Sequence, residues 1–501
     1  MIPASVAIVV FLVAAPTFVF AIGLLQPLPG AIMATLALIP MVALARATDW
    51  RGKPDRPILL GAFAIAVVLT LISGIGHFFW QTDDWMVRDA MLFDLMRNGW
   101  PVAYATPSGA GVLRAPLGMY LAPAALGKLG GAGVAQAALF VQNTILLGLC
   151  IYVLARVQEA GRARIIALAL FVVFSGADCI GWAQRRLAGL EGLDLPHLEP
   201  WSGQFQYASN VTEIFWTPHH ALGGWALVAA YLAWRAGRMR ALQIAPLWAA
   251  ACFWSPLVAL GALPFLAFAF VCDAMDGKLR GGDFALAAIA GAASLPLAYF
   301  LTRDTGAIEK GFIDLSDSQV LRGYIGLLGL EVAPFLALAW EGRDKADRRA
   351  SVELGLIAAS LVLIPLYRLG YANDFVMRVS IPALTLLCAR SVPALASLGQ
   401  QPVRQRIIAL AIVLVGAVTP AVEIWRNLGE KAFPASACNV MESLQDGPYA
   451  GSPLDYYIAR AESLATPSGL FTPPESAPLK RTIANCWPGR TFVYGPASPT
   501  K

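Results

Sequence analysis

Charged residues are scarce in this sequence, and their scarcity excludes an ordinary soluble protein. Only 14% of the 501 residues are Asp, Glu, Lys or Arg, and 57% are hydrophobic, whereas soluble domains carry about 25% charged residues. Several soluble domains of this composition would lack the polar surface that water requires. The net charge is +5 and the basic residues are scattered, so the sequence predicts no nucleic-acid partner. It predicts an integral membrane protein.

Basic residues are missing altogether from the first part of the chain, where the first one is Arg46. A cleavable signal peptide needs a basic segment at its start. The apolar run over residues 2–25 is also long enough to cross a bilayer, which takes about 20 residues. We therefore expect this run to be a permanent membrane span.

Long apolar runs are what the sequence has in abundance. Runs of roughly 15–25 residues predict an all-α, polytopic transmembrane helical bundle with about thirteen spans. We expect this bundle over residues 1–425, followed by a Pro-, Ser- and Gly-rich tail over residues 426–501. Pro256 should break the chain between two spans. The expected spans are residues 4–25, 31–45, 58–76, 134–155, 165–182, 219–234, 241–253, 258–272, 284–300, 323–340, 351–366, 379–396 and 407–424.

The distribution of Lys and Arg predicts the orientation in the membrane. Six short loops hold 19 of the 37 basic residues, and basic loops favour the cytoplasm. The N-terminus is then inside and the tail outside, in a cell inner (plasma) membrane. The loops on the outer side, 77–133, 183–218 and 301–322, are long and contain helix-like stretches. We expect them to be ordered, to carry amphipathic helices and to hold the function. The six basic loops are residues 46–57, 156–164, 235–240, 273–282, 341–350 and 390–406.

Cysteines are few, and five of the seven fall inside apolar runs, where they serve as small core residues. The other two, Cys438 and Cys486, lie in the tail. An extracytoplasmic compartment is oxidising, so two thiols together in one segment predict a disulfide. The alternative is that both are free or buried thiols.

The first long outer loop begins with two adjacent carboxylates, Asp83 and Asp84, between Trp80 and Trp85. Tryptophans favour the membrane–water interface, and residues 85–98 are typical of a short helix lying on the membrane. One interpretation is structural, with Asp83 as the N-cap of this helix and Asp84 in its first turn. The other is catalytic, with one of the two as a general base at the membrane surface.

This loop resembles the first outer loop of the GT-C superfamily of integral-membrane glycosyltransferases. The resemblance lies in the Asp-Asp pair, the helix and the Asn-Gly-Trp-Pro sequence at 98–101. The break at Pro256, the many spans and the long outer loops are also similar. The resemblance in architecture covers residues 58–425, whereas the resemblance in motif covers only residues 80–101. This chain differs in having two extra spans before the acidic loop. The resemblance implies an enzyme that uses polyprenyl-phosphate or -diphosphate sugars, with its essential carboxylate in this loop.

Two further polar clusters stand at the outer ends of expected spans. His219 and His220 mark the start of a helix, a natural place for a phosphate; the alternative is a polar pair that caps the span. Arg378 and Asp374, four residues apart, either pair with each other or bind a ligand, with Arg378 on a lipid phosphate. Arg114 is a further candidate for substrate binding.

We therefore expect a glycosyltransferase with its active site on the outer face of the membrane. Its donor would be a polyprenyl-phosphate-linked sugar, and its acceptor a glycan, a lipid or a protein. One residue of the acidic pair would take the proton of the acceptor, while His219, His220 and Arg378 hold the leaving phosphate. A divalent cation, Mg²⁺ or Mn²⁺, is an open alternative as cofactor, and no residue is assigned to a metal.

Two other classes of protein stay open. A transporter or flippase places ionisable groups inside its spans, where this sequence has few, among them Asp178, Glu331 and Glu353. A non-catalytic membrane assembly protein would use the outer loops to bind its partners. Assays with a panel of polyprenyl-phosphate sugars separate these classes from the enzyme.

Overall fold

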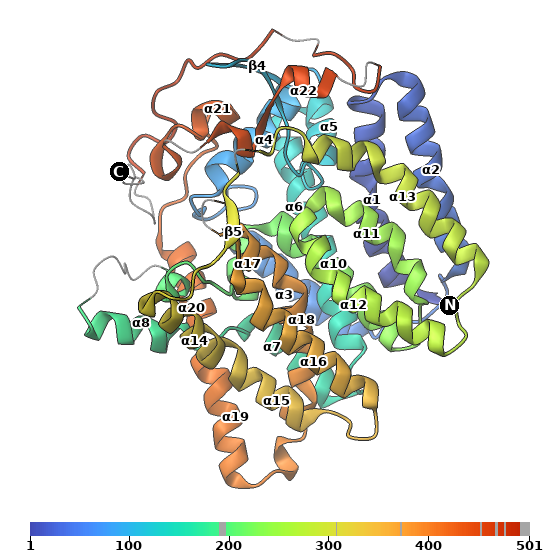
Figure 1. The fold of residues 1–501 in the computed structure, drawn as a ribbon, viewed down its shortest axis with the longest axis vertical. Coiled ribbons are helices and arrows are strands. Elements are labelled where there is room, and N and C mark those ends of the chain that lie inside the picture. The colour runs from blue at the N-terminus through green and yellow to red at the C-terminus, as the bar shows by residue number, and fades with distance from the viewer. Residues whose placement is uncertain are drawn as a thin grey trace.

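The computed structural model describes residues 1–189, 197–306, 308–370, 373–450, 453–465, 469–474 and 477–490. The fold is a bundle of helices with a few short strands (Figure 1). The helices are α1 (Ala4–Gly23), α2 (Pro27–Ala47), α3 (Arg56–Ile72), α4 (Trp85–Arg97), α5 (Leu121–Gly130), α6 (Ala132–Arg156), α7 (Arg162–Val173), α8 (Asp178–Leu187), α9 (Asn210–Trp216), α10 (Pro218–Arg235), α11 (Ala245–Trp254), α12 (Pro256–Met275), α13 (Gly281–Thr302), α14 (Ser318–Leu327), α15 (Ala333–Gly342), α16 (Arg348–Leu363), α17 (Asp374–Val379), α18 (Ile381–Ala396), α19 (Val403–Gly416), α20 (Val418–Gly429), α21 (Val440–Ser443) and α22 (Ala461–Ala465).

The apolar runs of the sequence coincide with these helices. Ten helical segments in the described part of the chain are long and apolar enough to cross a membrane, several of them formed by two consecutive helices. The segments α3 and Ala241–Trp254 are apolar but shorter, and α10 is a helix of 18 residues. Each of the predicted runs therefore falls on a helix. The number of spans and their orientation stay predictions.

The break predicted at Pro256 is present and has a local cause. Helix α11 ends at Trp254, and Ser255 adopts an extended backbone as the N-cap of α12. Its Oγ accepts a hydrogen bond from the backbone N–H of Val258 at 3.3 Å. Proline at the first position of α12 has no backbone N–H to satisfy, so it suits the start of this helix.

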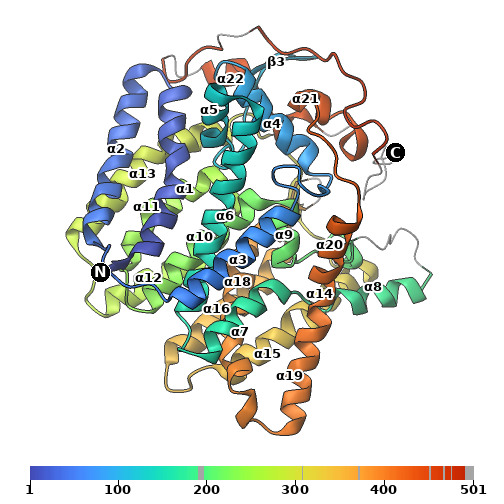
Figure 2. The ribbon, with the colours of Figure 1, turned by 180° about the vertical axis from the view of Figure 1, so that it is seen from behind.

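The tail is built into the first outer loop rather than standing apart from it. Strands β3 (Ala103–Thr106), β4 (Gly109–Leu113) and β7 (Ile458–Arg460) form one antiparallel sheet. Its third strand comes from the tail, which runs over the bundle above α5 (Figures 1 and 2). Two smaller sheets pair β1 (Ile2–Pro3) with β2 (Thr48–Asp49), and β5 (Lys310–Phe312) with β6 (Tyr367–Leu369).

The helix predicted over residues 85–98 exists as α4, and it is covered by other parts of the protein, while its place relative to the membrane surface stays a prediction. Residues Trp85–Leu95 are buried in a continuous run, because α5, α6 and the tail helix α21 pack around α4. Asp94 joins it to the tail, since its Oδ2 accepts hydrogen bonds from the Tyr104 hydroxyl at 2.7 Å and the Val440 N–H at 2.9 Å. Burial raises the pKa of Asp94 to about 7.

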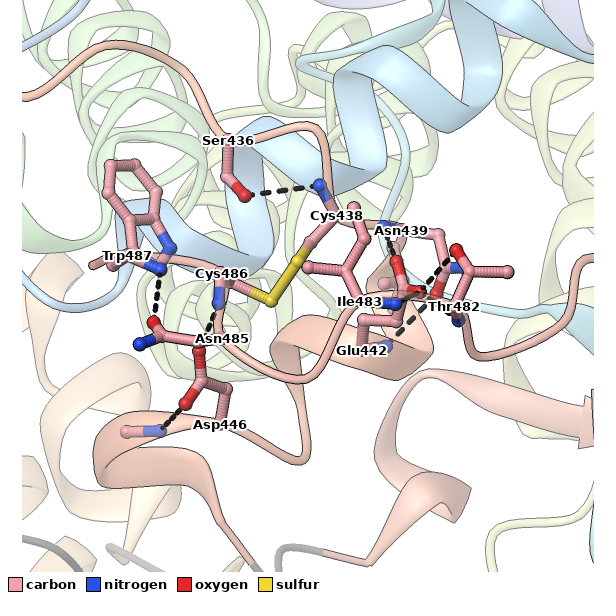
Figure 3. Close-up of a disulfide and its surroundings, with 12 residues drawn as sticks. Ser436, Cys438, Asn439, Glu442, Asp446, Thr482, Ile483, Asn485, Cys486 and Trp487 are labelled. Carbon is pink, nitrogen blue, oxygen red and sulfur yellow. Dashed lines mark hydrogen bonds between the residues drawn. A yellow bond between two sulfur atoms is a disulfide. The ribbon is translucent and has the colours of Figure 1, made fainter.

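The two tail cysteines, Cys438 and Cys486, are joined by a disulfide (Figure 3). Two carboxylate side chains connect the chain segments around the disulfide by hydrogen bonds. Glu442 accepts hydrogen bonds from the backbone N–H groups of Thr482 at 2.6 Å and Ile483 at 2.7 Å. Asp446 accepts one from the Cys486 N–H at 2.6 Å. The disulfide and these bonds hold the start and the end of the tail together over α4.

The orientation is tested by labelling single cysteines from outside intact cells. We expect an impermeant thiol reagent to modify a cysteine placed at Glu462 of the tail and to spare one placed at Ala346. Both positions are exposed, so accessibility of the side chain does not bias the comparison. The wild-type chain serves as the control for its native thiols. Labelling at position 346 with protection at 462 contradicts the positive-inside assignment.

Candidate functional site

A cavity of about 580 Å³ lies where segments far apart in the sequence meet. Its walls come from described residues within four segments, 83–88, 197–220, 368–378 (371 and 372 excepted) and 444–457 (451 and 452 excepted). The first two segments belong to, or directly follow, outer loops predicted from the sequence, the third stands at the predicted outer end of a span, and the fourth belongs to the tail. Six of the seven predicted catalytic or binding residues line this one cavity, namely Asp83, Asp84, His219, His220, Asp374 and Arg378.

The two adjacent carboxylates differ in their surroundings. The side chain of Asp84 is 21% exposed, and its Oδ2 accepts a hydrogen bond from Arg88 Nη2 at 2.6 Å. The side chain of Asp83 is 1% exposed and faces Arg490 of the tail, with 3.3 Å between Oδ1 and Nη2. Asp84 stands at the N-cap position of α4, but its side chain makes no capping hydrogen bond. The N-cap interpretation of Asp83 is therefore wrong, because Asp83 precedes the cap.

Arg88 connects the acidic pair to the histidines. Besides Asp84, its guanidinium binds the carbonyl oxygen of Trp216 through Nε at 2.8 Å and His219 Nδ1 through Nη1 at 2.9 Å. An arginine has no acceptor, so it donates to the ring, and Nδ1 of His219 carries no proton. A neutral His219 then has its proton on Nε2, which makes this atom the donor that it offers to a ligand.

His219 and His220 lie close together at the start of α10. Their ring centroids are 3.9 Å apart. His220 Nδ1 is 2.6 Å from Ser255 Oγ, the hydroxyl that caps α12. The break between α11 and α12 therefore positions one of the two imidazoles, and Arg88 positions the other.

Arg378 lies opposite these groups and has more than one acidic neighbour. Its Nη1 donates to Thr217 Oγ1 at 3.2 Å and lies 3.9 Å from Glu213 Oε1. Its Nη2 lies 3.6 Å from Asp374 Oδ1, so the predicted pair is present but loose. Arg378 Nε is buried and has no hydrogen-bond partner in the part of the chain that the structure describes. The guanidinium is thus held in place while keeping a donor for a ligand.

Arg114 is the one predicted binding residue that the structure does not bring into the cavity. It is buried, and its guanidinium donates to the backbone carbonyl oxygens of Asp455 and Tyr456. These bonds fix the tail segment whose next residue, Tyr457, lines the cavity. Arg114 therefore has a structural role, since it holds a segment of the cavity wall without lining the cavity itself.

Other cavity residues were missed or underrated by sequence reasoning. Glu213 lines the cavity on α9, and burial raises its pKa while Arg378 opposes the rise. His197 lines another wall, with Nδ1 2.9 Å from Oε1 of the buried Glu423. Tyr456 and Tyr457 come from the tail. Only Glu213 gave a local signal, as an acidic residue just before the two histidines; the others are placed by contacts distant in sequence.

The three ionisable residues named above inside expected spans each accept hydrogen bonds from other side chains. Trp201 Nε1 donates to Asp178 Oδ1 at 3.2 Å and to Glu331 Oε1 at 2.8 Å. Glu353 accepts from Arg235 at 3.2 Å and from Arg390 at 2.8 Å. The carboxylates of these three residues are therefore engaged in fixing helices, which is a weaker basis for transport than groups that open onto a path.

Metal ligands are not gathered anywhere in the described residues, where no group of three His, Cys, Asp or Glu side chains is arranged to hold an ion. The positive charge on the cavity wall is that of Arg88, Arg368 and Arg378. An anionic group that enters the cavity therefore meets guanidinium groups, which suit phosphate geometry.

The chain matches no protein-family model, no curated protein and no solved structure. The chemistry of the cavity is therefore the basis for assigning a function. That chemistry combines four carboxyl groups, three imidazoles and three guanidinium groups around a single space.

Proposed function

We propose that this protein is an integral-membrane glycosyltransferase that uses a polyprenyl-phosphate sugar and acts on the outer face of the inner membrane. The observation that carries the proposal is the convergence of Asp84, His219 and Arg378 on one cavity. These residues were selected separately from the sequence, as a base and as phosphate ligands, and they come from three different segments. A donor phosphate and an acceptor hydroxyl both need groups of these kinds.

In the proposed reaction a hydroxyl of the acceptor attacks the anomeric carbon of the donor sugar. Asp84 takes the proton of that hydroxyl as the new C–O bond forms. The bond between the anomeric carbon and the phosphate oxygen breaks, and the polyprenyl phosphate leaves with the electron pair. Arg378 and the Nε2–H of His219 stabilise the charge that develops on the leaving oxygen. The product has inverted configuration, because attack and departure occur on opposite faces of the sugar.

Asp84 fits the role of base better than Asp83 because of its position. Its side chain is 21% exposed against 1% for Asp83, and a base must reach the proton that it removes. Arg88 holds the Asp84 carboxylate through Nη2 and His219 through Nη1. The base and a phosphate ligand are thus fixed relative to each other by one guanidinium.

The function is tested with the purified chain in lipid nanodiscs and a panel of radiolabelled polyprenyl-phosphate hexoses and pentoses. We expect release of polyprenyl phosphate and transfer of label to a glycan, lipid or protein acceptor from the same cell envelope. The assay is run with EDTA and with added Mg²⁺ or Mn²⁺, so that any contribution of a divalent cation is measured. Movement of intact sugar-lipid between leaflets without transfer indicates a flippase, and absence of both activities contradicts the proposal.

Arg378→Lys should weaken binding of the donor lipid roughly tenfold or more. Lysine keeps the charge but loses the planar set of donors that suits a phosphate, and hydrogen bonds to charged groups are worth about 1.5–3 kcal/mol each. Affinity is measured with polyprenyl phosphate in nanodiscs, without an acceptor.

The charge-swapped variant Asp374→Arg/Arg378→Asp is the control for a merely structural pair. If Arg378 served only to bind Asp374, the swap would restore affinity. We expect no rescue, because the two groups are 3.6 Å apart and Thr217 also fixes Arg378. If the charge swap restores affinity for the donor lipid, His219 and His220 remain as the candidate ligands of the phosphate.

A further inference from the structure

Three buried polar atoms on the wall of the cavity have no hydrogen-bond partner among the described residues: Glu213 Oε1, Asn373 Oδ1 and Arg378 Nε. Their residues are 3%, 2% and 8% exposed and all line the same cavity. An unpaired buried polar atom costs about 1–3 kcal/mol, and a ligand in the cavity removes this cost by pairing with the atom. Three around one space point to a ligand that pairs with them.

The orientation of each group is fixed by its other contacts. Asn373 donates through Nδ2 to the carbonyl oxygen of Gln204 at 2.9 Å. A carbonyl accepts only, so the amide nitrogen must be on that side, and the amide oxygen is the atom left without a partner. Asn373 also has a positive φ of 55°, a conformation that Asn tolerates better than most residues.

Glu213 is fixed through Thr217. The hydroxyl of Thr217 accepts from Arg378 Nη1 at 3.2 Å and lies 2.6 Å from Glu213 Oε2, to which it donates its single proton. Glu213 Oε1 keeps no hydrogen bond and lies 3.9 Å from Arg378 Nη1. This relay holds the carboxylate beside the guanidinium with one oxygen available to a ligand.

The three atoms define the chemistry of the missing partner. Glu213 Oε1 and Asn373 Oδ1 are acceptors, so they need donors, whereas Arg378 Nε is a donor and needs an acceptor. A molecule with hydroxyl groups next to an anionic oxygen satisfies all three. We propose that Glu213 and Asn373 form the subsite for the hydroxyl groups of the donor's sugar ring, next to the phosphate on Arg378.

This inference rests on the proposed function for the nature of the donor, and it assigns Glu213 and Asn373 to sugar recognition rather than to proton transfer. Glu213 is then a specificity residue. It accepts from a hydroxyl, and a donor lacking that hydroxyl leaves a buried carboxylate oxygen unpaired. A site that hydrogen-bonds a hydroxyl group discriminates strongly against analogues that lack it. An apolar pocket discriminates much less between ligands that differ only in size.

The test measures binding alone, using polyprenyl phosphate and polyprenyl-phosphate glucose, galactose, mannose and arabinose with the full chain in nanodiscs. Wild type should bind at least one sugar-lipid more tightly than polyprenyl phosphate. Glu213→Gln should weaken that sugar-lipid about 10- to 100-fold, since a hydrogen bond to a charged group is lost, and leave polyprenyl phosphate within about twofold. Asn373→Gly should act in the same direction, because glycine keeps a positive φ without strain.

Glu462→Gln is the matched control, since it makes the same change on the exposed surface of α22 and should alter neither affinity. Thermal unfolding of each variant in nanodiscs shows whether it is folded. Fluorine in place of each ring hydroxyl of the best sugar-lipid then identifies the contact. At one position fluorine should weaken wild type about tenfold or more and leave Glu213→Gln unchanged, because fluorine does not donate.

Three outcomes overturn the inference: no sugar-lipid binding more tightly than polyprenyl phosphate, equal weakening of both probes by Glu213→Gln, or no weakening at all. Equal weakening would make Glu213 a support for Arg378. Because no acceptor is present, these results are independent of turnover. A chain that shows the expected binding but transfers no sugar contradicts the glycosyltransferase and leaves the subsite in place.

Discussion

Asp84→Asn should reduce turnover about 10²- to 10⁴-fold, the usual loss when a general base is removed. Asparagine cannot take the proton of an acceptor hydroxyl, but its amide oxygen still accepts the hydrogen bond from Arg88. Arg88 therefore stays beside His219 Nδ1, with which it makes a bond of 2.9 Å. We expect affinity for polyprenyl phosphate and thermal unfolding to stay close to wild type while kcat falls.

Asp314→Asn is the matched control for this variant. Asp314 is an exposed carboxylate on another outer loop, where it accepts hydrogen bonds from Ser316, and it lies outside the cavity wall. This variant should keep full activity. Full activity of Asp84→Asn would contradict Asp84 as base. Asp374 would then be the next candidate, since its side chain is 33% exposed on the same wall.

Arg490→Met should destabilise the folded chain by roughly 3–5 kcal/mol, because it removes the arginine partner of a buried carboxylate. Both side chains of the pair are almost fully buried, at 0% for Arg490 and 1% for Asp83. The arginine also donates to the carbonyl oxygen of Gln81 and lies over the rings of Trp80 and Trp487. Thermal unfolding in nanodiscs and protease sensitivity of the tail measure the loss.

The double variant Asp83→Asn/Arg490→Met is the control that isolates the ion pair. Removing both charges leaves no uncompensated carboxylate, so much of the stability should return. The double variant should also keep turnover, since Asp84 is unchanged. A folded double variant that has lost turnover a hundredfold would move the base from Asp84 to Asp83. Unfolding of Arg490→Met at the wild-type temperature would show that the pair is not stabilising.

The sequence predicted the helices well because burial in a membrane leaves a direct record in composition. Every predicted apolar run falls on a helix, and the break at Pro256 follows from the missing backbone N–H of proline. The helix over 85–98 was found within one residue at its C-terminal end. Its burial was not predicted, since nothing local reveals that a tail some 340 residues later covers it through Val440.

The candidate site shows the same contrast between local features, which the sequence reveals, and contacts between distant segments, which it does not reveal. Asp84, His219 and Arg378 were found because charged or imidazole groups at the outer ends of apolar runs are rare and therefore conspicuous. Arg114 was conspicuous for the same reason, but its charge is used on backbone carbonyl oxygens of the tail. Asn373 was given no role, because the direction of its amide depends on the Gln204 carbonyl. Contacts between distant segments decided all of these cases.

The strand of the tail within the sheet has a consequence for the time at which the protein becomes competent. Ribosomes build the chain from the N-terminal end, so the walls at 83–88 and 197–220 exist before the wall at 444–457. Strand β7 and the disulfide between Cys438 and Cys486 can form only after that late segment has been made. During biogenesis the cavity therefore lacks one wall until the last stretch of the chain has been made and has folded onto the bundle. The order of synthesis thus makes the closing of this cavity one of the last steps in the folding of the chain.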